Sequence, residues 1–405
     1  MALGLSFRGS CPSAPQGSTV GAVSEAVAAL QSRFGYEVYQ ESPTQVVLEF
    51  GPTALLSLRV DADVIVGDAA TTPGGPGFHK AVVDLLDELI ETAGLSLEVE
   101  DETGYWRHRD FDRLRQEQMT WLRALIRQVS SWEQTTLRIT WPVDGWAPAG
   151  ATGIVTPMGR FTHGFLRGEL ERDGLAEFAH RFFLWPNPER DAYYHRARAL
   201  YQLWNECRWV APRTEAEELL LSTIAGSLGT ARRLDPALPL PLEAWSEVVT
   251  LLGGDPAGVV KGPDMAIGEP VGYRRGDVLE PFPGGWQVRL PGSFLPEPEE
   301  DGGAVYWDAG RNFRLTGYRY SPPGPGQEDP TDRLLTNPTF DEVIGGYRFQ
   351  AETSYEPDEH CWVLQGLVRG PGGMAVITLT WSDPRWEDWA VETFRTIQPP
   401  PLAPD

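Results

Sequence analysis

One stretch decides the fold of the N-terminal part of this chain: residues 73–99, which read PGGPGFHKAVVDLLDELIETAGLSLEV. Its glycines and prolines turn the chain into a helix, in which apolar residues recur at the spacing of one buried face. Acidic residues occupy the opposite face, and Gly94 stands where a helix end favours a left-handed residue. The stretch therefore predicts a helix over 78–93, followed by a strand at 95–99.

The residues around this stretch predict the rest of a layered domain. The expected elements are a strand at 5–8, a helix at 20–34, and strands at 36–40, 45–50 and 55–66. Together with the helix and strand of 73–99, they give the β-α-β-β-α-β order of a ferredoxin-like or related α/β layer, with one extra strand. A helix at 110–130, with Asp110 as its N-cap, is expected to cover the sheet.

The middle of the chain predicts a helical layer after a short extended pair at 137–141 and 153–156. Helices are expected at 168–183, 189–207 and 242–252. Between the last two, the capping box of Thr214 and Glu217 opens a helix that carries Leu220, Ile224 and Leu228. The stretch 253–263 is rich in glycine and proline and predicts a linker. We therefore expect a domain at 1–252, a linker at 253–265, a second domain at 266–398 and a tail at 399–405.

The C-terminal third predicts an antiparallel sheet closed by a helix. Strands are expected at 286–290, 304–308, 312–320, 347–355, 361–368 and 374–381, with an exposed loop at 321–332. The turn at 370–373 makes the last pair a hairpin. Alternate residues from Tyr347 to Tyr355 share a face that needs a cover, and a helix at 386–396 is expected to supply it. The whole chain is thus of the α+β class.

The C-terminal third also resembles a known group of domains. Its opening, Gly285-Trp286-Gln287-Val288 with Leu290-Pro291, and its closing helix, Glu392 to Ile397, are similar to those of PsbP and DcrB-like α/β domains. That resemblance implies a binding or accessory module without enzymatic activity. The whole chain also looks like large bacterial proteins associated with toxin-immunity gene clusters.

The composition excludes several classes of function. The chain has 34 Lys plus Arg against 57 Asp plus Glu, a net charge of −23, which would repel nucleic acid. Three scattered cysteines favour reduced thiols over a disulfide framework. The N-terminus has no signal-peptide pattern, and no apolar run could cross a bilayer. We expect a cytoplasmic protein that contacts neither membrane nor nucleic acid; its oligomeric state is left open.

No motif for metal, nucleotide or nucleophile chemistry occurs in the chain. The six histidines are dispersed, so no local zinc motif can be written. The Gly-x-Ser-x-Gly elbow of many hydrolases is absent. We therefore predict no cofactor, no metal and no catalytic residue.

Two segments are candidate binding sites. The first follows a sharp charge reversal at 98–110, where Tyr105, Trp106, Arg107, His108 and Arg109 are residue types that carry interface energy. The simpler interpretation, which we favour, is a strand end and a helix start cross-linked by ion pairs, with Asp110 as the N-cap. The second is His79 at the opening of the helix after Gly77, where backbone amides could hold an anion. The simpler interpretation is that the glycines and prolines only turn the chain into the helix and that His79 is a hydrogen-bonded residue at the edge of its apolar face.

Two further segments favour structural interpretations. Asp61 and Asp63 would share one face of the expected strand and could bind a cation, but a solvated strand face is the simpler reading. The tryptophan-rich segment 381–389 is expected to pack between the C-terminal sheet and its helix.

The leading prediction is an immunity-like or accessory protein, not an enzyme, whose acidic surface binds a basic protein partner. One alternative is an enzyme whose dispersed site is built around the helix openings at 76–79 and 105–110. The other is a chaperone or adaptor that uses the C-terminal sheet.

Overall fold

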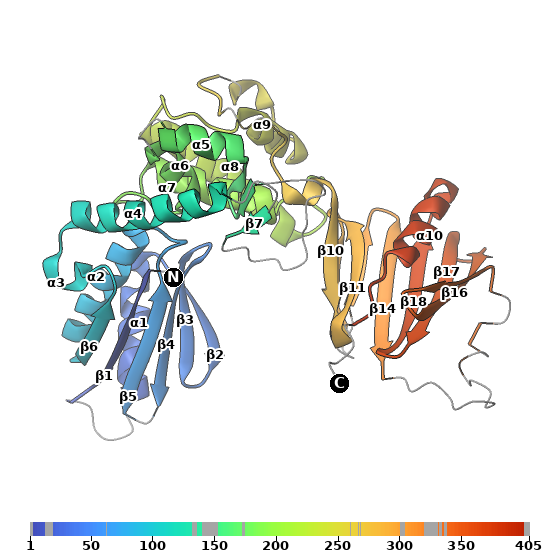
Figure 1. The fold of residues 1–405 in the computed structure, drawn as a ribbon, viewed down its shortest axis with the longest axis horizontal. Coiled ribbons are helices and arrows are strands. Elements are labelled where there is room, and N and C mark those ends of the chain that lie inside the picture. Colours follow the sequence, from blue (N-terminus) through green and yellow to red (C-terminus); the bar gives the residue numbers. More distant parts are fainter. Residues whose placement is uncertain are drawn as a thin grey trace. The chain divides into compact units, whose positions relative to one another are not determined.

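A computed structural model describes residues 3–12, 19–61, 63–131, 136–139, 153–171, 175–259, 261–265, 267, 269–299, 304–319, 331, 334–335 and 338–400. These residues form a mixed α+β structure, which confirms the predicted fold class (Figure 1). They divide into two compact units, one ending at Gly272 and one beginning at Tyr273, which also includes residues 208–210.

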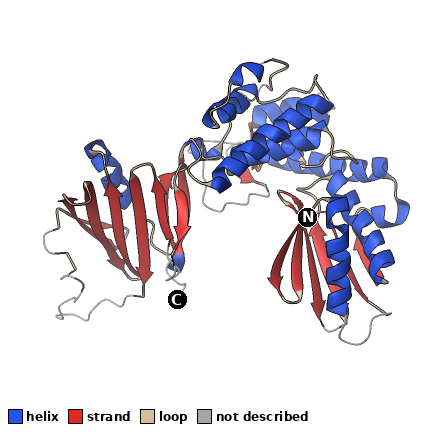
Figure 2. Cartoon of the chain, turned by 180° about the vertical axis from the view of Figure 1, so that it is seen from behind, coloured by secondary structure: helices blue, strands red, loops and turns tan. Residues whose placement is uncertain are grey.

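The first unit begins with a six-stranded antiparallel sheet of strand order β2-β3-β4-β5-β1-β6. Two helices, α1 and α2, lie over one face of this sheet (Figure 2). The elements are β1 (Gly4–Ser10), α1 (Thr19–Phe34), β2 (Glu37–Ser42), β3 (Gln45–Gly51), β4 (Ala54–Asp61), β5 (Val64–Ala70), α2 (Pro76–Ala93) and β6 (Ser96–Asp101). The first strand lies between β5 and β6, as the split β-α-β order predicts.

The prediction of one strand over 55–66 is wrong, because the chain folds back within it. Strand β4 ends at Asp61, β5 starts at Val64, and these two residues face each other in the antiparallel pair. Val60 and Ile65 are both buried and are also opposite each other. They are five positions apart, so a continuous strand would place them on opposite faces. The hairpin places both on the inner face and gives the sheet two extra strands rather than one.

Beyond β6 the first unit is mainly helical, as predicted. It contains α3 (Tyr105–His108), α4 (Phe111–Ser130), β7 (Thr136–Arg138), β8 (Gly153–Thr156), β9 (Gly159–Phe161), α5 (His163–Glu171), α6 (Ala176–Phe182), α7 (Ala192–Asn205), α8 (Glu215–Leu234) and α9 (Leu242–Leu251). The helix expected over 168–183 is two helices, α5 and α6. Asp110 caps α4 by accepting from the Arg113 amide, as expected. Thr214 likewise caps α8 through the Glu217 amide, but the Glu217 carboxylate accepts from the amide of Arg213.

The stretch predicted as a linker packs against these helices. Val259 and Met265 are buried, and Asp264 forms a bridge with Leu240. The Arg232 side chain donates to the carbonyl oxygen of Val259 at 2.7 Å. The compact units divide after Gly272, beyond this stretch.

The second unit holds a two-stranded and a seven-stranded antiparallel sheet, the latter of order β12-β13-β14-β18-β17-β16-β15. The elements are β10 (Asp277–Phe282), β11 (Trp286–Pro291), β12 (Leu295–Pro298), β13 (Ala304–Asp308), β14 (Arg311–Tyr318), β15 (Phe340–Ile344), β16 (Tyr347–Glu356), β17 (Cys361–Gly370), β18 (Gly373–Trp381) and α10 (Glu387–Arg395). Short 3-10 turns occupy Pro256–Gly258 in the first unit and Tyr273–Arg275, Pro283–Gly285 and Pro384–Trp386 in the second. The loop expected at 321–332 lies, apart from Thr331, outside the described residues.

Helix α10 covers the seven-stranded sheet. This cover was predicted from the alternate residues of 347–355, which share one face of the strand. Phe394 of α10 is buried, and its ring lies 5.7 Å from the ring of Phe349 on β16. Trp381 is buried, while Trp386 and Trp389 pack against the same core. The segment 381–389 therefore has the packing role expected for it.

Candidate functional site

The outer face of the N-terminal sheet, which α1 and α2 leave uncovered, is hollowed into a trough. Two hollows of about 590 and 610 Å³ meet at Ser6, Asp68 and Glu100. The pairing register explains the shape, because the small Ser6 of β1 lies between Asp68 of β5 and Glu100 of β6. Five acidic residues and three arginines line the trough: Asp68, Glu98, Glu100, Asp101 and Glu102, with Arg8, Arg59 and Arg107. Its charge is therefore negative.

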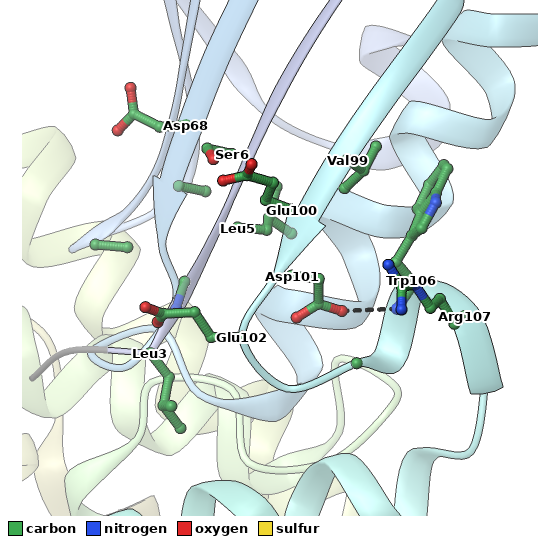
Figure 3. A pocket seen from close by; sticks show the side chains of 14 residues that line it. Leu3, Leu5, Ser6, Asp68, Val99, Glu100, Asp101, Glu102, Trp106 and Arg107 are labelled. Atoms are coloured by element: carbon green, nitrogen blue, oxygen red, sulfur yellow. Dashed lines mark hydrogen bonds between the residues drawn. The ribbon is translucent and has the colours of Figure 1, made fainter.

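Trp106 stands at one end of the trough, beside Arg107, while Glu100 lies across β6 from it (Figure 3). Its backbone amide donates to the Asp101 carboxylate at 2.7 Å, and its carbonyl oxygen accepts from Nε of Arg109 at 2.9 Å. The Arg109 guanidinium lies 4.5 Å from the centre of the indole ring. These contacts fix the tryptophan before any partner arrives, which reduces the entropy lost on binding.

Behind the trough, the two sequence candidates meet in a buried cluster. His79 on α2 is fully buried and its ring lies 5.9 Å from that of Tyr105, edge to face. Its Nδ1 is 2.9 Å from the Thr71 hydroxyl, and its Nε2 is 3.3 Å both from the Thr103 hydroxyl and from the Asp101 carboxylate. The structure thus joins the helix openings at 76–79 and 105–110, which are far apart in sequence.

Asp101 is the anchor of this cluster. Its side chain is 2% exposed, and it accepts hydrogen bonds from the Thr103 amide and hydroxyl, each at 2.8 Å. Burial acts to raise its pKa, but the hydrogen bond and charge of His79, together with the Trp106 amide and the Thr103 hydroxyl, hold the pKa well below its usual range. The carboxylate is therefore ionised inside the protein, and its hydrogen bonds hold Thr103 and the Trp106 amide in place.

The opening of α2 does not present its amides to an external anion. The Gly77 amide donates to the carbonyl oxygen of Trp185 at 2.9 Å, and the Trp185 amide donates to that of Gly74 at 2.8 Å. A Cβ atom on Gly77 would lie 2.2 Å from the Asn187 carbonyl oxygen, so only glycine permits this approach. The glycine-rich turn at 74–77 therefore packs closely against the segment at Trp185 to Asn187.

Arg109 and His108 have structural contacts. Arg109 adopts a left-handed backbone with φ of 53° and binds the Asp87 carboxylate through two nitrogens, at 2.6 and 2.9 Å. The Nδ1 of His108 accepts from the Asp110 amide at 3.0 Å, so Nε2–H faces the Thr103 carbonyl at 3.4 Å. Of the six sequence candidates, only Trp106 and Arg107 line the trough.

Arg109→Ala is expected to lower the free energy of unfolding by about 1 kcal/mol, because the ion pair with Asp87 is partly exposed and screened by water. Urea denaturation measures this change. Arg109→Lys keeps the charge but loses the two-point contact, and we expect most of the loss to remain. If the free energy of unfolding falls several times more than this, Arg109 stabilises more of the fold than its contacts with Asp87 and Trp106 account for.

Sequence reasoning missed most of the trough. Ser6, Asp68, Glu98 and Glu100 come from three strands that are apart in sequence and adjacent only in the sheet. The available signal was the alternation of acidic residues at 98, 100 and 102 along one strand face. Asp61 and Asp63 do not share a strand face as expected, because Asp61 ends β4 and Asp63 lies in a turn, where it accepts from the Thr19 hydroxyl at 3.0 Å.

Comparisons with known proteins give no family for this chain. No protein-family model matches it, and no curated protein matches it. Among the described residues, no three His, Cys, Asp or Glu side chains gather as a metal site. No helix in that part of the chain combines the length and apolar character needed to cross a bilayer. The resemblance of the C-terminal third stays a prediction.

Proposed function

We propose that this chain is a non-enzymatic, immunity-like or accessory protein that binds a basic protein partner in the trough of its N-terminal sheet. The observation that carries the proposal is a fixed tryptophan at the end of an acidic trough. A rigid aromatic side chain supplies contact area at low entropic cost, and acidic groups around it select basic side chains.

The charge of the whole chain supports the same proposal. A net charge of −23 attracts a basic protein over the Debye length of about 8 Å at physiological salt and beyond it at lower salt. Asp68, Glu98 and Glu100 are exposed, so they remain solvated until the partner replaces their water. We further propose that the protein acts in the cytoplasm, where thiols stay reduced. The absence of a disulfide among Cys11, Cys207 and Cys361 supports this proposal.

The enzyme alternative depends on the two helix openings, which do meet at His79 and Tyr105. However, His79 and Thr71 are fully buried and Thr103 is 5% exposed. A reacting group needs contact with its substrate, whereas these side chains are closed off from solvent and hydrogen bonded to one another. Their arrangement therefore supports a structural role.

The test begins with capture of a basic protein from the source cells and its identification by mass spectrometry. We expect its association with the purified chain to slow roughly tenfold between low and physiological salt. Glu98→Lys with Glu100→Lys should slow association further, and Trp106→Ala should chiefly speed dissociation, about tenfold or more. Surface plasmon resonance measures both rates.

Glu243→Lys is the matched control, because Glu243 is an exposed acid on α9, outside the trough. It makes the same change of charge as Glu100→Lys alone and should alter association far less than that single replacement in the trough. An association rate that is indifferent to salt and to the trough replacements would contradict the proposal and leave the acidic charge a role in solubility only.

A further inference from the structure

We propose a second interaction surface at the outer edge of the N-terminal sheet: strand β2 takes up an extended partner segment whose side chains alternate between apolar and basic. The segment would add a strand to the sheet. This surface lies at the opposite edge of the sheet from β6 and the Trp106 end of the trough, so the inference goes beyond the function proposed above and does not rest on it.

Strand β2 has the backbone needed for such pairing. Within the described residues it pairs only with β3, so alternate amides and carbonyl oxygens along its other side point outward. Every residue from Glu37 to Glu41 is exposed. Strand addition uses these outward groups for affinity and the neighbouring side chains for selectivity.

An apolar groove borders the inner side of this edge. It has a volume of about 260 Å³ and lies between α1 and β2, with Val23, Val27, Val38, Val46, Leu58 and Val60 among its walls. Val38 is 38% exposed, although it belongs to the face of the sheet that the helices cover. Helix α1 leaves Val38 partly uncovered, so apolar surface remains open at β2.

The other side of the same strand is acidic. Glu37 and Tyr39 alternate with Val38 and Gln40, so they point to the outer face. Glu41 lies where the pairing with β3 is irregular, and its carboxylate accepts from the Gln45 side chain, which belongs to the same outer face. The Tyr39 hydroxyl donates to the Glu37 carboxylate at 2.8 Å. A strand paired with β2 would therefore place alternate side chains beside the apolar groove and beside two carboxylates, which selects apolar residues on one face and Lys or Arg on the other.

The same charges disfavour a second copy of this chain as the occupant. If two β2 strands paired antiparallel about Tyr39, Glu37 of each copy would face Glu41 of the other. Like charges directly opposite each other destabilise a strand pair, and edge charges commonly prevent such self-association. The partner that these residues fit is a different chain of opposite charge.

The experiment uses the full chain and a fluorescent peptide of about eight residues, the length of an ordinary strand, in which lysine and valine alternate. One control peptide has the same composition with the lysines and valines in separate blocks, and another alternates glutamate with valine. We expect fluorescence anisotropy to show binding of the lysine–valine peptide at least about tenfold tighter than of either control. Hydrogen exchange should slow in β2 and not in β6.

Two variants test the two sides of the strand. Glu37→Lys with Glu41→Lys should weaken binding of the lysine–valine peptide about tenfold. Val38→Glu should weaken it by a similar factor by placing a charge at the groove. All three positions are exposed, so thermal unfolding should be unchanged, and Glu91→Lys, at an exposed position of α2, is the control for a single reversal of charge.

Equal binding of the alternating and block peptides would overturn the proposal by showing attraction to charge alone. Protection that appears at β6 or the trough instead of β2 would overturn it as well. Concentration-dependent association of the chain with itself, abolished by the β2 variants, would assign the edge to a second copy. None of these outcomes depends on the trough variants Trp106→Ala or Glu100→Lys, so the two proposals fail separately.

Discussion

Replacing Asp101 by asparagine is expected to lower the free energy of unfolding of the first unit by about 3 kcal/mol, because it removes an ionised carboxylate from a buried set of donors. The Thr103 amide, the Thr103 hydroxyl and the Trp106 amide all donate to Asp101, and His79 lies beside it. An asparagine presents one oxygen and one amino group to donors that need two oxygens. Urea denaturation at neutral pH measures the loss.

The same carboxylate predicts a dependence of stability on pH. Folding lowers the pKa of Asp101, chiefly through His79, the Trp106 amide and Thr103 acting against burial. The folded protein therefore holds this carboxylate ionised where the unfolded chain protonates it, at about pH 4. The stability it contributes is complete above that pH and is lost as the pH falls toward the lower folded pKa. Asp101→Asn should lack this part of the acid-induced loss.

Asp68→Asn is the matched control for this prediction. Asp68 is an exposed acid in the trough, and we expect its replacement to change stability by less than about 0.5 kcal/mol. If Asp101→Asn is as stable as Asp68→Asn, or loses stability with acid as steeply as the unaltered chain, Asp101 does not organise the cluster.

The sequence predicts the fold of the N-terminal unit well because each signal there is local. The helix after Gly75 is defined by apolar spacing and by Gly94, and the Asp110 cap needs only residues three positions apart. The error over 55–66 arose because the chain reverses between Asp61 and Val64, within a run that is apolar both before and after the reversal. The available sign of the hairpin was a shift in the alternation of apolar residues: Val60 and Ile65 are five positions apart, yet both belong to the inner face.

The candidate site was harder to predict because its parts come together through strand pairing. Residues 98–109 were identified from charge and aromatic content, but their division into buried and exposed members depends on what packs behind them. Tyr105 turns inward onto His79, and Trp106, the next residue, borders the trough. No local sequence pattern predicts that Ser6 lies between Asp68 and Glu100, because this arrangement depends on the order of the strands in the sheet.

The largest expected effect in the second unit comes from Phe394→Ala, which should lower its free energy of unfolding by about 4 kcal/mol. Phe394 is fully buried on α10, with its ring 5.6 Å from Phe340 and 5.7 Å from Phe349. The sheet has made room for it at Gly366, where an added Cβ would lie 2.3 Å from the ring. Truncation leaves a cavity between α10 and three strands that the paired sheet cannot collapse to fill.

Hydrogen exchange resolved by peptide separates this prediction from a general loss of stability. Exchange should accelerate in α10 and in β15 to β17, while β1 to β6 of the first unit keep their protection, because Phe394 packs within the core of the second unit. Val343→Ala, at a side chain that is 73% exposed on β15, is the control and should have little effect. Gly366→Ala should itself destabilise the unit by about 1–3 kcal/mol, since the Phe394 ring must move. If Phe394→Ala accelerates exchange equally in both units, the two units unfold together. That result would contradict the prediction that the core of the second unit unfolds separately from the first.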